Sequence, residues 1–116
     1  MSDMFPPFIR ALPAPDSDFD FDAFMVGSDR AITMFYETDH ELLVPEHTHG
    51  AQWGVVLSGE MEMVIDGVAA IYGAGDTYYV PPHTRHEARL FAGCTGIDVF
   101  ADSDRYKPRH HGTRDD

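Results

Sequence analysis

The sequence predicts an all-β protein that folds as one barrel or sandwich. Valine, isoleucine, tyrosine and phenylalanine occur in short runs separated by Gly, Pro and Asp turns, which is typical of this class. No segment has the pattern of a convincing amphipathic helix. A chain of 116 residues is long enough for one compact domain with a single core and leaves little room for a second.

Eight strands are expected to follow one another from residue 31 onward. The clearest signal is Asp66-Gly67, a dipeptide that supplies the positive φ angles of a type I′ hairpin turn. Before this turn, methionines alternate with glutamates, so that strand has one buried and one largely wet face. The predicted strands are residues 31–37, 41–44, 51–57, 60–65, 68–72, 77–80, 86–91 and 95–101.

Residues 1–30 are predicted to form an extended N-terminal arm. Pro6, Pro7 and two later prolines argue against regular structure in its first half. Residues 18–22 then alternate Asp and Phe, as an edge strand does. We expect these phenylalanines to pack the arm against the barrel, residues 31–106, or across a dimer interface.

Two other groups of potential metal ligands are set aside. The aspartates at the start of residues 16–27 resemble a calcium loop, but Phe21 stands where an EF-hand needs glycine and Gly27 where it needs glutamate. His110 and His111 lie in residues 107–116, which we expect to form a polar C-terminal tail without a second metal site.

The charge is one-sided. The net charge is −12; residues 1–80 hold fourteen acidic side chains against two basic ones, whereas residues 81–116 hold six of each. Such a surface repels nucleic acid and anionic lipid, and no apolar run is long enough to span a bilayer. The start lacks a signal peptide, and the single cysteine, Cys94, can form no internal disulfide and has no signature of a nucleophile. We expect a soluble, cytoplasmic protein that binds neither nucleic acid nor membrane.

Three histidines indicate a metal site. Residues i and i+2 of an extended chain point to the same side, so His47 and His49 can bind one ion, and Gln52 is near enough to add its amide oxygen. A turn, a β-rich run and a proline break then deliver His86 to the start of another strand. A His-x-His pair alone is common on solvated strands, but two such segments in this order are hard to explain by packing.

The segments His47–Gly59 and Gly75–His86 resemble the paired motifs of the cupin superfamily. The resemblance implies a double-stranded β-helix, a jelly-roll-like barrel over residues 31–106, that holds one divalent metal ion between antiparallel strands. By motif position the implied ligands are His47, His49, Gln52 and His86, with Gln52 standing where many cupins carry glutamate. Four neutral ligands leave the ion its charge, which favours Lewis-acid chemistry on anionic substrates. Zinc, nickel, manganese, iron and cobalt all remain open.

Asp98 is the second clue, in the last predicted strand. Asp98 and Phe100 share one face of that strand, and Ile97 and Val99 share the other. A carboxylate inside a barrel is unfavourable unless it is paired, hydrogen-bonded or near a cation, and the metal can be that cation. The opposite phase, with Asp98 wet, is equally compatible with the sequence.

The segments Gly75–Pro82 and Asp98–Phe100, followed by an arginine, resemble the small pectin-degradation cupins of the KdgF type. Those proteins convert cyclic unsaturated uronates to open-chain keto forms. The resemblance implies that Asp98 is the acid/base, that Phe100 packs on the substrate, and that Arg105 binds a carboxylate. Tyr78 and His83 are further candidates for substrate contact, whereas Trp53 should point away from the metal.

Three functions remain open. The first is a metal-dependent isomerase or lyase that acts on a small oxygen-rich acid such as an unsaturated sugar acid. The second is an iron dioxygenase at the same ligands, and the third is a small-molecule-binding or structural barrel without chemistry. A homodimer is expected, because small barrels have exposed sheet edges.

Overall fold

The fold is a two-sheet β structure, as the sequence predicts. The computed structural model describes residues 4–16 and 19–107. Within them lie one short helix and nine strands: α1 (Pro7–Arg10), β1 (Asp22–Gly27), β2 (Ile32–Glu37), β3 (Leu42–His47), β4 (Gln52–Ser58), β5 (Glu60–Ile65), β6 (Val68–Gly73), β7 (Thr77–Val80), β8 (His86–Leu90) and β9 (Thr95–Phe100).

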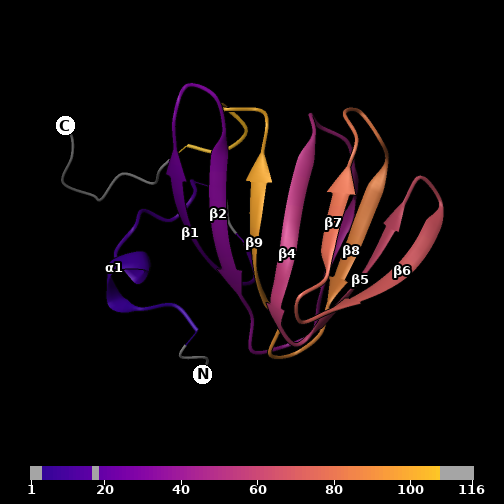
Figure 1. Ribbon diagram of the computed structural model, residues 1–116, viewed down its shortest axis with the longest axis horizontal. Coiled ribbons are helices and arrows are strands. Elements are labelled where there is room, and N and C mark those ends of the chain that lie inside the picture. Colours follow the sequence, from indigo (N-terminus) through magenta and orange to yellow (C-terminus); the bar gives the residue numbers. More distant parts are fainter. Residues whose placement is uncertain (1–3, 17–18, 108–116) are drawn as a thin grey trace.

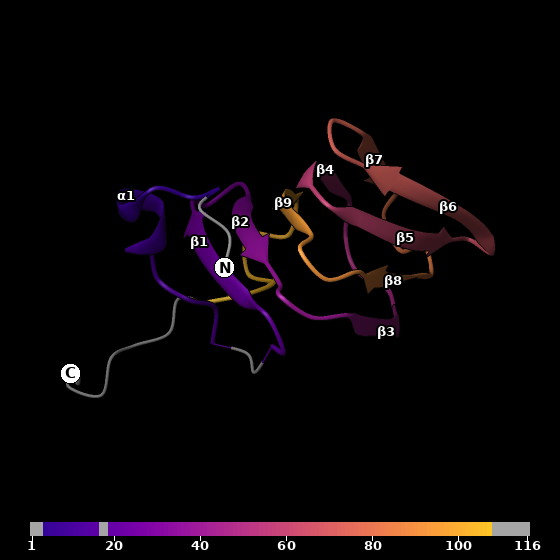
Figure 2. The ribbon, with the colours of Figure 1, turned by 90° about the horizontal axis from the view of Figure 1, so that it is seen from below.

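The strands form two antiparallel sheets. One has the order β1-β2-β9-β4-β7 and the other the order β3-β8-β5-β6. Figures 1 and 2 show the second sheet on one side of the molecule and α1 beside β1 on the opposite side. The chain crosses between the sheets after β2, β3, β4, β6, β7 and β8, which gives the jelly-roll-like architecture.

The core lies between the facing sheets, where every second residue of a strand points inward. Val56 of β4, Met61 and Met63 of β5, and Leu90 of β8 belong to one buried cluster. The Asp66-Gly67 hairpin joins β5 to β6, and both residues have positive φ angles. β9 is central to this arrangement because it pairs with β2 on one side and with β4 on the other.

The N-terminal arm is more regular than the prolines predict. Residues 7–10 form one helical turn whose first position is Pro7. Proline is tolerated there because the first turn needs no N–H from that residue and its fixed φ suits a helix. The edge strand is β1, which starts at Asp22, so the Asp/Phe alternation of residues 18–22 precedes it.

The arm is held to the sheets by contacts of several kinds. β1 pairs with β2 along its whole length, from Asp22 opposite Glu37 to Gly27 opposite Ile32. Arg10 donates two hydrogen bonds to the buried Glu37 carboxylate, at 2.7 and 2.9 Å.

Within the described part of the chain, no helix has the length and apolar character to cross a membrane. Most of the predicted polar tail, residues 108–116, lies outside the described residues.

Candidate metal centre and adjoining cavity

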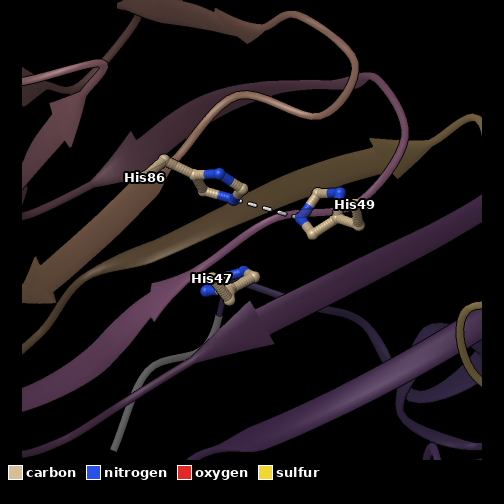
Figure 3. A group of neighbouring side chains, drawn as sticks. All are labelled: His47, His49 and His86. Atoms are coloured by element: carbon tan, nitrogen blue, oxygen red, sulfur yellow. Dashed lines mark hydrogen bonds between the residues drawn. The ribbon is translucent and has the colours of Figure 1, made fainter.

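Three histidines converge at one end of the sheets. One potential ligand atom from each of His47, His49 and His86 lies within 4.8 Å of the others (Figure 3). The His47 and His86 rings are 4.2 Å apart at their centroids, because these residues are direct partners across the β3–β8 ladder. His49 and His86 are buried and His47 is half-buried. The predicted convergence of these three residues is therefore observed.

His49 reaches the cluster from a loop and not from a strand. β3 ends at His47, after a register shift between Val44 and His47, and β4 begins at Gln52. The loop backbone is fixed from two directions: the His49 carbonyl accepts a hydrogen bond from the His83 N–H at 2.7 Å, and the Gly50 N–H donates to Asp102 at 2.8 Å. The His-x-His spacing predicts both imidazoles on one extended segment; His47 ends β3 whereas His49 lies in the loop, and both rings still reach the same cluster.

The protonation of the three rings suits a metal ion. Each Nδ1 atom lies 2.7 or 2.8 Å from a backbone carbonyl: that of Pro45 for His47, of Gly50 for His49 and of Thr84 for His86. A carbonyl can only accept, so each Nδ1 carries the proton, and in a neutral ring the Nε2 atom then has a free lone pair. This is the arrangement by which metal-binding histidines are oriented.

The contact between His49 and His86 gives a test of that fit. Their Nε2 atoms lie 3.0 Å apart, the contact marked in Figure 3. Burial lowers the pKa of His49 to about 4 and also lowers the pKa of His86, and the nearby Arg105 guanidinium adds to both shifts. Both rings are therefore neutral at pH 7, and two lone pairs face each other. A cation between them would turn this repulsion into ligation, so the donor set fits a divalent transition metal.

Gln52, the fourth predicted ligand, is the first residue of β4 and is buried. It lines the same cavity as His47 and His86. Its side chain also hydrogen-bonds to Asp98. Because an ionised carboxylate only accepts, the amide nitrogen is the donor, which leaves the amide oxygen free for another partner. Its assignment as a ligand stays a prediction.

A cavity of about 350 Å³ extends from the histidines into the barrel. This volume lies at the small end of ligand pockets, so it suits a small molecule. His47, His86, Asp98 and Arg105 all line it. Phe19 and Phe21 of the N-terminal arm, whose rings are stacked at 4.7 Å, lie at its wall as well.

Asp98 faces this cavity and not the solvent outside the sheet. Its Oδ1 atom accepts a hydrogen bond of 2.6 Å from the Tyr78 hydroxyl, and the Tyr78 oxygen lies 3.0 Å from that of Tyr36. Burial raises the pKa of Asp98 to about 6, while the hydrogen bonds from Tyr78 and Gln52 act in the opposite direction. Of the two strand phases that the sequence left open, the structure has the inward one.

Arg105 and Phe100 lie together at the wall of the same cavity. The guanidinium carbon of Arg105 is 5.6 Å from the centre of the Phe100 ring and 4.9 Å from that of Tyr106. The Arg105 Nε atom is buried and has no hydrogen-bond partner among the described residues. The same residues provide no carboxylate within ion-pair distance of it. Phe100 also packs edge-to-face against His49 at 5.6 Å.

The remaining predicted residues lie outside the cavity. His83 is exposed in a turn with a φ of 59° and is not among the residues that line the cavity, so its contribution is the backbone bond to His49. Trp53 and Tyr79 pair across β4 and β7 and are exposed on the outer face, as predicted for Trp53. Cys94 is fully buried, and burial raises its pKa to about 12.

The cavity wall also contains four aromatic residues that the sequence did not predict there: Phe19, Phe21, Tyr36 and Tyr106. Tyr36 could have been found from its place in β2, two residues after the inward-facing Met34. The arm residues could not, because no local pattern tells where an arm crosses the barrel.

Comparisons with known proteins agree with this fold. The model of the cupin domain family matches residues 36–90, which contain all four predicted metal ligands. A solved structure of an RmlC-like cupin from Shewanella frigidimarina is 27% identical, covers 90% of this chain and 95% of its own, and superimposes with a TM-score of 0.75. The chain belongs to the cupin superfamily.

More distant cupins share the fold. KdgF from Halomonas sp. is 19% identical to this cupin, with 98% of this chain and 100% of that chain covered and a TM-score of 0.70. A Bacillus subtilis oxalate decarboxylase variant is 20% identical, with 79% of this chain but 28% of that chain covered and a TM-score of 0.65. Among curated proteins, none matches this cupin.

Proposed function

We propose that this cupin is a metal-dependent enzyme that isomerises a small oxygen-rich acid, with an unsaturated sugar acid as the candidate substrate. One observation carries the proposal: a single cavity of about 350 Å³ is lined by two of the three clustered histidines, an inward-facing carboxylate and an arginine without a carboxylate partner among the described residues. The resemblance to KdgF-type cupins supports the choice of substrate.

The three histidines would hold the metal ion, with Gln52 as a fourth ligand. When bound, a divalent ion supplies Lewis acidity at substrate oxygen atoms. Lewis acidity at that end of the cavity favours substrates with adjacent oxygens, such as a hydroxyl beside a carboxylate.

Arg105 would orient the substrate. Its guanidinium faces the cavity with a buried Nε that has no partner among the described residues, and a planar guanidinium pairs with a carboxylate through two parallel hydrogen bonds. The Phe100 ring beneath it supplies a flat surface for the substrate's carbon atoms.

Asp98 would move the proton. Opening an unsaturated uronate ring removes a proton from a hydroxyl oxygen and adds one to a carbon of the same molecule, so the reaction needs no co-reactant. A carboxylate inside the cavity can accept the first proton and deliver the second. Tyr78 holds this carboxylate in place.

The metal is tested first. Elemental analysis of untagged wild-type protein and of His49→Ala is expected to find near-stoichiometric metal in the former and little in the latter. Zinc, nickel or manganese supports the Lewis-acid enzyme, whereas iron together with oxygen uptake supports the dioxygenase alternative. Absence of metal from wild type, even after supplementation, contradicts both enzymes.

Turnover is tested next. Wild type and Asp98→Asn are incubated with unsaturated uronates released by a pectate or alginate lyase, and loss of the ultraviolet absorbance of the unsaturated ring is followed. We expect turnover by wild type only, with equal metal content in both proteins. Retained turnover by Asp98→Asn would refute the role of Asp98.

The homodimer and the cytoplasmic location remain predictions. The exposed pair Trp53 and Tyr79 offers a place to test the dimer, since Trp53→Ser removes a large apolar side chain from the outer face. Sedimentation velocity of both proteins measures whether a dimer exists and depends on this face.

A further inference from the structure

Asp98 accepts the last hydrogen bond of a chain whose other two members, Tyr36 and Tyr78, are buried. We propose that Tyr36 and Tyr78 are positioning residues, which form a hydrogen-bond chain of fixed direction that orients Asp98 and directs its proton exchange to the Oδ2 atom. This inference rests on the proposed role of Asp98 as the acid/base of the reaction.

The direction of the chain follows from counting protons. A phenol has one proton to donate, and Tyr78 gives its own to Asp98 Oδ1 at 2.6 Å. The oxygen of Tyr78 must therefore accept in its 3.0 Å contact with Tyr36, which makes Tyr36 the donor. The order is Tyr36 to Tyr78 to Asp98, and it cannot reverse while Asp98 is ionised.

The chain ends at Tyr36. Tyr36 and Tyr78 are 3% and 4% exposed, and no described residue donates a hydrogen bond to the Tyr36 oxygen. Burial, reinforced by the charge of Asp98, raises the pKa of both phenols well above the usual value, so both remain donors. A chain that is closed at its far end cannot conduct protons to solvent. Its effect is to hold the carboxylate.

Two glycines make room for these side chains. Gly54 of β4 lies opposite Asp98, and a Cβ atom there would clash with Asp98 Oδ1 and with the Tyr78 ring. Gly96 of β9 lies opposite Tyr36, and a Cβ atom there would clash with the Tyr36 hydroxyl. A glycine inside a strand weakens the sheet and is found where another group approaches closely. Both glycines mark the path of the chain.

Asp98 needs this support because its last torsion angle is soft. Rotation about χ2 of an aspartate exchanges Oδ1 and Oδ2 with little preference between angles. A charge-assisted hydrogen bond of 2.6 Å fixes Oδ1 against Tyr78, and the Gln52 amide is the other side-chain partner of the carboxylate, so proton exchange with a ligand would take place at the second oxygen. Misplacement of a reacting group by a fraction of an ångström lowers the rate, so Tyr78 and, through it, Tyr36 should raise kcat.

The chain is tested without substrate by proton NMR. Wild type is compared with Tyr36→Phe, Tyr78→Phe and the control Tyr72→Phe, whose ring packs on Tyr78 at 5.5 Å but whose hydroxyl makes no hydrogen bond with the described residues. We expect two slowly exchanging hydroxyl protons, the one from Tyr78 far downfield. Tyr78→Phe should remove the Tyr78 signal. Tyr36→Phe should remove the Tyr36 signal and move the Tyr78 signal upfield. Tyr72→Phe should change neither signal. A Tyr78 proton unmoved by Tyr36→Phe, or no Tyr78 hydroxyl signal at all, overturns the proposal.

Kinetics tests the consequence. Relative to wild type, Tyr78→Phe should lower kcat by about tenfold or more and Tyr36→Phe by about threefold, with KM within about twofold, because positioning acts in the transition state. A raised KM at constant kcat, or an equal loss in Tyr72→Phe, contradicts a positioning role. If wild type opens no unsaturated uronate, the proposed function fails, while the NMR comparison still decides the chain.

Discussion

Gly54 in the middle of β4 offers the sharpest test of how the site is packed. The substitution Gly54→Ala adds one methyl group to the face that carries Asp98 and Tyr78. The new Cβ would overlap Asp98 Oδ1 and two ring carbons of Tyr78, which is itself buried. Neither neighbour can yield without breaking the 2.6 Å hydrogen bond between them.

The expected loss of stability can be estimated from three contributions. Forcing a methyl group into a packed interior costs about 1–3 kcal/mol. Breaking a hydrogen bond to a charged acceptor removes about 1.5–3 kcal/mol. Alanine restricts the unfolded chain more than glycine, which returns roughly 0.5–1 kcal/mol. The free energy of unfolding of Gly54→Ala should therefore be lower by roughly 2–5 kcal/mol.

Urea unfolding of wild type, Gly54→Ala and Gly27→Ala measures this difference. Gly27 ends β1, and the nearest atom to its added Cβ would be Ile32 Cγ1 at the ordinary distance of 3.5 Å, so Gly27→Ala should stay within about 0.5 kcal/mol of wild type. Combining Gly54→Ala with Asp98→Ala should recover part of the loss. Equal stability of the two glycine variants would refute the account of why glycine stands at position 54.

Three further predictions concern titration, reactivity and metal binding. In metal-free protein the pKa of Asp98 is raised to about 6, so the folded state binds this proton more tightly than the unfolded state and stability falls as the pH rises from about 4 to 6. Between pH 4 and 7 the difference in unfolding free energy between wild type and Asp98→Asn should therefore change by up to about 3 kcal/mol. A difference that stays constant with pH contradicts the raised pKa. Cys94 is fully buried and its pKa is raised to about 12, so in the folded protein it should react with a thiol reagent at least about a hundredfold more slowly than in a denaturing concentration of urea, roughly 8 M. Equal rates would show that the thiol is accessible in the folded protein. A bound metal should raise the unfolding free energy by about 2.7 kcal/mol at a hundredfold excess over its Kd, a gain that His86→Ala should abolish.

The fold and the clustering of the three histidines were predictable because their signals are local. Alternation along the strands and the Asp66-Gly67 turn fix which residues face inward and where the chain reverses. His47 and His49 are two residues apart between two predicted strands, and His86 starts another, so their convergence was expected from the His-x-His spacing and the order of the strands. The helix at Pro7 was missed because proline was considered only as a breaker of regular structure and not as a first helical residue.

The environment of Asp98 could not be predicted from local pattern. Its strand phase was ambiguous because apolar residues occupy both faces of β9: Ile97 and Val99 on one, Phe100 on the other. The structure has the inward phase, in which Asp98 accepts a hydrogen bond from Tyr78, a residue 20 positions away on β7 of the same sheet. Glycines at positions 54 and 96, inside two strands, were a local sign of a crowded interior.

The cavity has two chemically different walls, which limits the ligands it can take. The hydrogen-bonding side chains Tyr36, Gln52, Tyr78 and Asp98 all belong to the five-stranded sheet. Apart from the histidines, the four-stranded sheet lines the cavity with apolar side chains, among them methionines 61 and 63 and leucine 90.

A ligand coated with hydroxyl groups on both faces would leave some of them against the apolar wall, at roughly 1–3 kcal/mol for each unpaired group. An unsaturated acid, whose planar carbons carry fewer hydroxyls, avoids that penalty. We therefore expect a saturated uronate to compete with the unsaturated one at least about tenfold more weakly, since one unpaired hydroxyl corresponds to that factor. Competition between the two acids during turnover, measured for wild type and for Met63→Gln, gives the ratio of their affinities. The added polar side chain on the apolar wall should bring the two affinities closer together. An unchanged ratio would show that the wall does not select the ligand.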